Sequence, residues 1–250
     1  MHCKNCGEKT KGNYCSHCGQ ATSVGKITLS SLSHEISTSL FQLDRGFFFT
    51  LKELFVRPGT SIRDYLNGKR KNYFKPVAYV LTLSTFYFIV SQSIGQKTWM
   101  GDIITGFLNG AMESEKDLMI YSFLSWFSNN FAYTTLLLLP VFSLASHLSF
   151  KRFGINYPEH VILNSYITGQ QAIIYSLFAF IRLAGNHEIF EMLPFVFSFC
   201  YAIWVFYSFF EEGNRFINIL RSISTYLLFI AFFILMMLIG ASVVGLTKAL

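Results

Sequence analysis

The chain has 250 residues, of which 52% are hydrophobic and only 14% are charged, and 28 residues are Phe. Soluble domains carry nearer to about 25% charged residues, so this composition argues against an ordinary soluble protein and favours an integral membrane protein. The net charge of +6 is unevenly spread, because residues 1–75 hold 12 Lys and Arg against five Asp and Glu. Such asymmetry favours contact with an anionic surface.

A cysteine-rich segment, residues 1–22, opens the chain with the pattern Cys-x2-Cys-x8-Cys-x2-Cys, and a glycine follows each second cysteine. The four cysteines are Cys3, Cys6, Cys15 and Cys18. Each Cys-x2-Cys pair presents two sulfurs from one tight turn, and two facing turns form a tetrahedral S4 site that suits Zn2+. The segment is therefore predicted to be a minimal zinc ribbon with a structural Zn2+ that supplies its folding energy. Iron is the chemical alternative in the same site.

Other uses of the four cysteines are less favoured. Disulfides are rare on the reducing, cytoplasmic side of a membrane, where the segment is expected to lie. A thioredoxin-like redox site uses one Cys-x2-Cys motif near a βαβ pattern, which this sequence lacks. A closed S4 site has no open position for catalysis. Because no aromatic stacking platform surrounds the cysteines, no nucleic-acid partner is expected.

Residues 23–75 are predicted to form cytosolic or interfacial amphipathic helices. Apolar residues recur every three to four residues over 29–43, a second apolar face follows over 47–55, and Pro58-Gly59 ends it. A basic cluster then precedes the first predicted membrane span, and it comprises Lys69, Arg70, Lys71 and Lys75. Such a cluster can contact anionic lipid headgroups, although most basic runs of this kind act only as topology signals.

Residues 41–81, preceded by the cysteine pattern CxxCG…YCxxCGQ, resemble an uncharacterised bacterial membrane-protein family, domain of unknown function 3667. The matching residues are Asp44-Arg45-Gly46, Thr50, Arg57-Pro58-Gly59, Arg63, Tyr65, Gly68-Lys69-Arg70, Tyr73 and Pro76. The resemblance covers roughly the first 80 residues. It implies a location in the cell membrane and assigns no activity.

Residues 76–250 are predicted to form a transmembrane helical domain. A membrane span needs about 20 mostly apolar residues, and five stretches qualify, near residues 76–94, 131–150, 161–183, 192–210 and 223–246. The predicted fold class is thus an all-α integral membrane bundle of about five transmembrane helices with a small N-terminal zinc ribbon. We expect a multi-pass protein of the cell's inner membrane. The basic residues before the first span predict that its N-terminus lies on the cytoplasmic side. Four spans would return the C-terminal tail to the cytoplasm.

The third predicted span is the most polar of the five. It carries His160, Asn164, Thr168 and Gln171, which share one helix face because their spacings are four, four and three residues. Such a face could line a substrate or ion path. Hydrogen bonding between helices explains the same residues and is favoured, because no Asp, Glu, Lys or Arg lies in the middle of the span.

The sequence contains no recognisable catalytic motif, since zinc-protease, P-loop and GxSxG signatures are all missing. We therefore expect a non-enzymatic membrane scaffold whose ribbon recruits an unidentified cytosolic protein, with anionic membrane lipids as further partners. The alternative is a small transporter or lipid-handling protein that uses the polar face of the third span. An intramembrane enzyme ranks third among the candidates, because the sequence offers neither a nucleophile–base pair nor an open metal site.

Overall fold

The computed structural model describes residues 1–32, 46–95, 98, 101, 126–127, 129–184 and 189–249. Its helices are α2 (Gly46–Val56), α3 (Pro58–Leu66), α4 (Pro76–Ser93), α7 (Phe131–Ser149), the 3-10 helix η1 (Lys151–Phe153), α8 (Tyr157–Ala184), α9 (Ile189–Phe209) and α10 (Arg215–Ala249). Within these residues the only β-structure is two isolated bridges, both in the cysteine-rich segment. The predicted all-α fold class is confirmed for this part of the chain. The apolar stripe predicted over 29–43 lies mostly outside it.

Local sequence explains where the helices next to the ribbon begin and end. Pro58 and Pro76 stand at the first positions of α3 and α4, where a missing N–H costs nothing and the fixed φ suits a helix. Gly68 follows the end of α3 with a φ of +104°, a conformation that residues with a Cβ rarely adopt. Gly68 therefore ends α3 in a turn.

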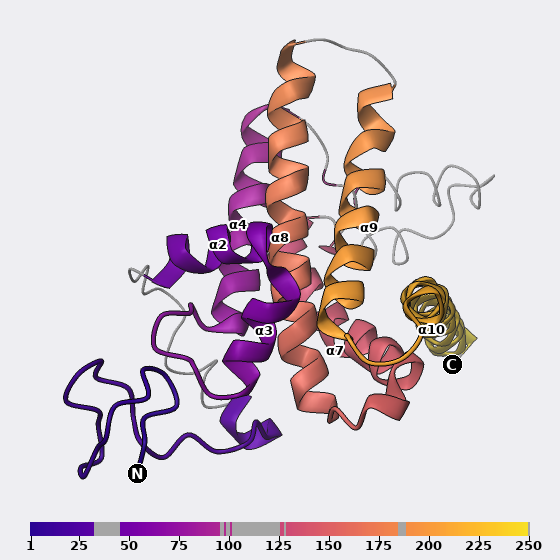
Figure 1. The fold of residues 1–250 in the computed structure, drawn as a ribbon. Coiled ribbons are helices and arrows are strands. Elements are labelled where there is room, and N and C mark those ends of the chain that lie inside the picture. Colours follow the sequence, from indigo (N-terminus) through magenta and orange to yellow (C-terminus); the bar gives the residue numbers. More distant parts are fainter. Residues whose placement is uncertain are drawn as a thin grey trace.

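Helix α8 lies at the centre of the fold. It packs against α4, α7 and α9 and also against the short helices α2 and α3. Figure 1 shows α4, α8 and α9 side by side, whereas α10 is seen end-on and crosses them. Helix α10 packs on α7 and α9. The helices therefore do not form one parallel bundle.

Three helical segments are long and apolar enough to cross a membrane, namely Phe131–Ser149, Met192–Phe209 and Arg215–Met236. They correspond to the second, fourth and fifth predicted spans. Helices α4 and α8 coincide with the first and third predicted spans but do not meet this criterion among the described residues, so five transmembrane helices are not confirmed. The physical reason is polarity, because these inner helices bury polar side chains such as Ser84 and Gln170.

Side chains of the long helices α8 and α9 bind backbone carbonyls of α2 and of Phe74, which lies just before α4. The Tyr166 hydroxyl donates to the Phe74 carbonyl (2.8 Å), and the Tyr201 hydroxyl donates to the Leu54 carbonyl (3.0 Å). The Gln170 amide donates to the Leu51 carbonyl (3.1 Å) and accepts from the Tyr79 hydroxyl (2.7 Å). A buried carbonyl without a partner is costly, so these bonds fix α2 on α8 and α9.

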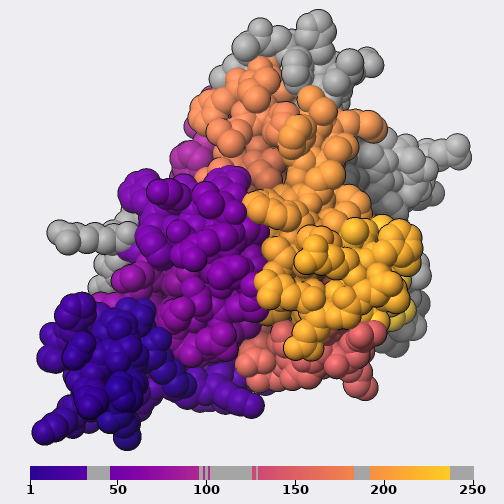
Figure 2. Space-filling view, viewed as in Figure 1, coloured from indigo at the N-terminus to yellow at the C-terminus, as the bar shows by residue number. Residues whose placement is uncertain are grey.

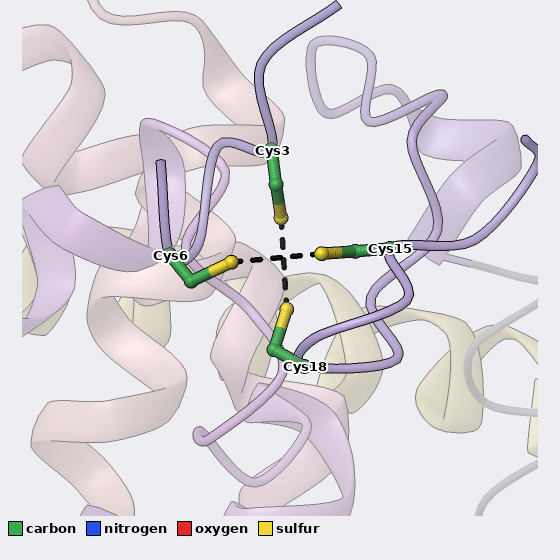
Figure 3. Close-up of side chains that lie close together, drawn as sticks. All are labelled: Cys3, Cys6, Cys15 and Cys18. Carbon is green, nitrogen blue, oxygen red and sulfur yellow. Dashed lines mark hydrogen bonds between the residues drawn. The ribbon is translucent and has the colours of Figure 1, made fainter. Parts of the chain in front are cut away.

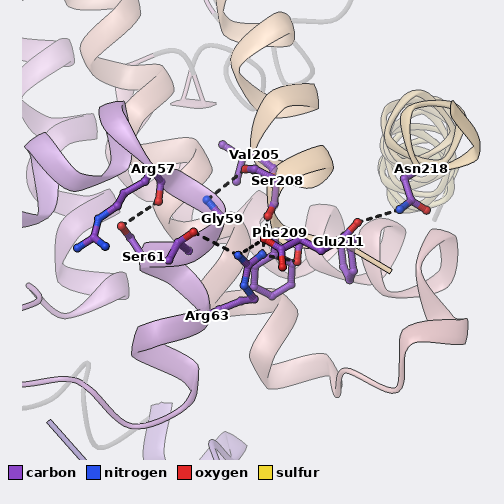
Figure 4. A network of polar contacts seen from close by, with 11 residues as sticks. Arg57, Gly59, Ser61, Arg63, Val205, Ser208, Phe209, Glu211 and Asn218 are labelled. Atoms are coloured by element: carbon purple, nitrogen blue, oxygen red, sulfur yellow. Dashed lines mark hydrogen bonds and ion pairs between the residues drawn. The ribbon is translucent and has the colours of Figure 1, made fainter. Parts of the chain in front are cut away.

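Helix α3 makes a backbone-to-backbone contact with the end of α9 (Figure 4). A Cβ on Gly59 would lie 2.2 Å from the carbonyl carbon of Ser208, and the Gly59 N–H donates to the Ser208 hydroxyl at 3.2 Å. The Arg63 guanidinium donates to the carbonyls of Ser208 and Phe209 and pairs with Glu211. A cation at a helix C-terminus satisfies its last carbonyls, so Arg63 caps α9.

The close approach at Gly59 gives a first testable prediction. Replacing Gly59 with Ala should lower the free energy of unfolding by about 1–3 kcal/mol, because the added methyl group meets backbone that cannot move away. Thermal unfolding of the purified full chain would measure the change. Gly25→Ala is the matched control, because no atom lies within 4 Å of its added Cβ. Equal midpoints for the two variants would contradict the prediction.

Candidate metal centre

The sulfur atoms of Cys3, Cys6, Cys15 and Cys18 all lie within 4.8 Å of one another. Cys3 Sγ is 3.6 Å from Cys18 Sγ, and Cys6 Sγ is 3.5 Å from Cys15 Sγ. Figure 3 shows the four side chains pointing to a common centre, and none of them forms a disulfide. Zn–S bonds of about 2.3 Å in a tetrahedron place the sulfurs about 3.8 Å apart. The predicted ligand set is therefore brought together with the geometry of a metal site.

Each cysteine pair belongs to a tight turn that glycine completes. The Gly7 N–H donates to the Cys3 carbonyl and the Gly19 N–H to the Cys15 carbonyl, both at 2.8 Å. The φ angles of the two glycines are +79° and +71°, in the left-handed region that favours glycine. The bridges between His2 and Lys9 and between Tyr14 and Ala21 close the turns. The segment therefore has the form of a small ribbon.

The electrostatic environment separates the pKa values of the thiols. The N–H of Cys6 lowers the pKa of Cys3, and the N–H of Cys18 lowers the pKa of Cys15 to about 6. The N–H of Glu8 acts in the same direction on Cys6, but burial and the three neighbouring sulfurs outweigh it and raise its pKa to about 12. Four adjacent thiols cannot all ionise without a cation, so a metal ion must displace protons to bind here.

The side chain of Gln20 attaches the ribbon to the rest of the protein. It is 5% exposed, and its Nε2 donates to the Gly68 carbonyl at 2.8 Å. Its Oε1 accepts from the backbone N–H groups of Arg70 (2.9 Å) and Lys71 (3.0 Å). Sequence reasoning did not assign this role to Gln20. Its place at the end of the YCxxCGQ motif is the signal that could have found it.

Further contacts extend the attachment on both sides of Gln20. Lys4 donates to the Val24 carbonyl at 2.8 Å, and its side chain lies where a Cβ on Gly68 would stand. Arg70 donates to the Gly25 carbonyl at 3.0 Å and stacks over the Tyr65 ring at 5.5 Å. Figure 2 shows the ribbon directly against the residues that follow it in the chain. The ribbon is thus docked on the segment between α3 and α4.

The basic cluster predicted to contact lipid headgroups surrounds this docking site. Lys69 pairs with Asp64 at 2.8 Å, and Arg70 binds the protein itself. The side chains of Lys71 and Lys75 are exposed. Lipid contact by the cluster stays a prediction, because no structural observation bears on it.

The polar face predicted on the third span lies along α8 and contacts three helices. Asn164 Nδ2 and His160 Nδ1 are 2.7 and 3.0 Å from the Ser146 hydroxyl on α7. Gln171 donates to the Ser198 carbonyl on α9 and to the Tyr226 hydroxyl on α10, at 3.2 and 3.1 Å. Thr168 is half-buried. Hydrogen bonding between helices, the favoured interpretation, is thus observed for three of the four residues.

The arrangement is that of a helical protein with apolar helices that can cross a membrane and an N-terminal cluster of four cysteines that can hold a metal ion. Residues 44–88 match a family described as "Protein of unknown function (DUF3667)", which confirms the resemblance for that segment. No curated protein and no solved structure matches the chain. The family match covers Gly59, Arg63 and Gly68, so it includes both the α9 cap and the ribbon's docking site.

The cysteine cluster gives a second prediction. The purified full chain should hold about one metal ion, and Cys15→Ser should abolish this, because each thiolate is one of four ligands. Lowering the pH should weaken retention of the ion, since protons compete with the metal for the four thiolates.

Metal analysis after gel filtration would measure both effects. Cys200→Ser is the matched control, because Cys200 is an exposed thiol that lies outside the cluster. Equal metal loss in the two variants, or a metal content that does not depend on pH, would argue against a four-thiolate centre.

Proposed function

We propose that the protein is a non-enzymatic membrane scaffold, whose structural zinc ribbon presents a docking surface for a cytosolic protein partner. The observation that carries this proposal is the fixed attachment of the ribbon through Gln20. A ribbon held by three hydrogen bonds to backbone groups keeps one orientation relative to the helices. Such a composite surface can recognise a partner with little loss of conformational entropy on binding.

Zinc is the metal that we propose for the centre. Four thiolates in a tetrahedron suit Zn2+, and a closed four-ligand site is typical of structural zinc. Iron accepts the same ligand set, so metal analysis of the purified protein decides between them. When bound, the ion supplies folding energy to a segment that has almost no hydrophobic core of its own.

We further propose that the protein crosses the cell's inner membrane five times, with its N-terminus on the cytoplasmic side. The ribbon, the start of α4, the α7–α8 turn and the α9–α10 turn lie toward one end of the molecule (Figure 1). Basic residues gather in these turns, including Lys151, Arg152 and Arg215. Retention of Lys and Arg on the cytoplasmic side supports this orientation. Helices α4 and α8 can span despite their polarity, because other helices cover their polar side chains.

A third prediction separates docking of the ribbon from its folding. Gln20→Ala should leave the metal content unchanged but lower the amount of co-purifying cytosolic protein, because the ribbon folds yet loses its fixed orientation. Mass spectrometry of the proteins that co-purify with the full chain would measure this. Gln92→Ala, at an exposed glutamine near the end of α4, is the matched control.

The proposal fails if a chain lacking residues 1–22 retains every co-purifying protein and the full cellular phenotype. A loss of metal in Gln20→Ala would also contradict the separation of folding and docking, because Gln20 does not contact the sulfurs.

A second candidate is a small transporter or lipid-handling protein that uses the polar face of α8. Two buried atoms favour it, because His160 Nε2 and Asn164 Oδ1 have no hydrogen-bond partner among the described residues. Each such atom is costly unless something binds it. A bound polar species would give both atoms a partner.

The fourth prediction tests this candidate with Asn164→Leu, Thr168→Val and Gln171→Leu combined. Hydrogen bonds between membrane helices are worth about 0.6 kcal/mol each, so the triple variant should still fold. If transport is the function, the folded variant should no longer restore the phenotype of a strain that lacks the gene. Full restoration by a variant with an unchanged unfolding temperature would rule out this use of α8.

A further inference from the structure

Two arginines, Arg152 of η1 and Arg221 of α10, both lie over the ring of Phe153. Their guanidinium carbons lie 5.3 and 5.6 Å from the ring centroid. Arg221 also donates to the Asn218 side chain at 2.9 Å, and Arg152 lies beside Gly213, where a Cβ would be 2.8 Å from its Nη2. The α7–α8 turn and the first turns of α10 therefore hold two positive charges close together.

No acidic side chain neutralises this pair within the described part of the chain. The ion pairs found there join Arg57 to Glu53, Arg63 to Glu211 and Lys69 to Asp64. Two like charges held on one ring repel each other, and an anion between them removes that repulsion. Guanidinium groups match the oxygens of phosphate and carboxylate groups with paired hydrogen bonds, so a phosphate group suits the pair.

An apolar groove of about 550 Å³ lies between α7 and α10. Pro140, Val141 and Leu144 line it from α7, and Phe232, Leu235 and Met236 line it from α10. Both helices contain candidate membrane spans, and only 11% of the apolar window of α10 is buried in the protein. The groove therefore opens on a surface that a membrane would cover with acyl chains.

The arginine pair and the groove share one seam. Arg221 and Phe232 lie on the same face of α10, three helical turns and about 16 Å apart. On α7 the chain runs the opposite way, and Leu144 precedes η1 by about two turns, or roughly 10 Å. The distance of about 16 Å between Arg221 and Phe232 along α10 resembles the half-thickness of a bilayer's hydrocarbon core, about 15 Å. One end of the seam is thus cationic, and the other end is apolar at membrane depth.

We propose that the seam between α7 and α10 binds one anionic phospholipid, with its phosphate between Arg152 and Arg221 and an acyl chain in the groove. The positive charge at one end of the seam complements a phosphate, and this favours a phospholipid over an apolar helix of a partner protein. This site is separate from the metal centre and from the basic cluster of Lys69, Lys71 and Lys75. It is also independent of the proposed scaffold function.

The test uses the delipidated full chain in detergent, with phosphatidylglycerol and phosphatidylcholine of identical acyl chains as probes. Native mass spectrometry measures the fraction of protein that retains each lipid. The wild type should prefer phosphatidylglycerol, and the double variant Arg152→Ala, Arg221→Ala should bind it about tenfold more weakly. Arg215→Ala removes the same kind of charge from the same helix, where it stacks on Tyr207, and should have no effect.

A second variant addresses the groove without touching the charges. Leu144 is 42% exposed, so Leu144→Trp can fill the groove without disturbing the core. It should weaken retention of both lipids. If the double arginine variant does not fold, lipid retention by Leu144→Trp alone tests the proposed site.

Three results would overturn the proposal. The first is unchanged retention of phosphatidylglycerol in the double arginine variant or in Leu144→Trp. The second is an equal loss in Arg215→Ala, which would mark a general charge effect. The third is competition by glycerol phosphate as effective as that by the intact lipid, which would mark a site for soluble anions.

Discussion

Side-chain donors that bind backbone carbonyls hold the two short helices to the long ones, and the rest of the structure depends on these contacts. Gln170 and Tyr201 bind carbonyls of α2, Tyr166 binds the Phe74 carbonyl just before α4, and Arg63 binds the last carbonyls of α9. Helix ends leave carbonyls without partners, and burying them without a donor is costly. Donors from distant parts of the chain therefore determine where α2 and α3 lie, and Gly59 permits the close approach.

The position of the metal centre follows from that framework. Because α3 is fixed on α9, the backbone groups of Gly68, Arg70 and Lys71 present one acceptor and two donors to the single amide of Gln20. The ribbon then gains an orientation that its own cysteines cannot supply, since those set only its internal fold. The cysteine ribbon and the helical domain are thus coupled through one glutamine, and the proposed docking function rests on that coupling.

Sequence patterns predicted the elements and the cysteine cluster better than they predicted the arrangement. The four ligands follow from Cys-x2-Cys spacing, because two tight turns bring sulfurs together whatever surrounds them. The helices were also expected, with α10 beginning at Arg215 rather than near residue 223. Five spans were not confirmed, because α4 and α8 bury polar side chains in the protein, and hydropathy does not reveal what a polar residue faces.

The sequence by itself determined the metal ligands, the all-α class and the apolar helices, because local spacing and composition encode each of these. The tertiary structure alone decided what long-range contacts bring together. Gln20 meets the backbone near Gly68, about 50 residues away, and Arg221 joins Arg152 at the ring of Phe153. Pairings of this kind depend on how helices pack and where turns lie, and no periodicity within a single segment records them.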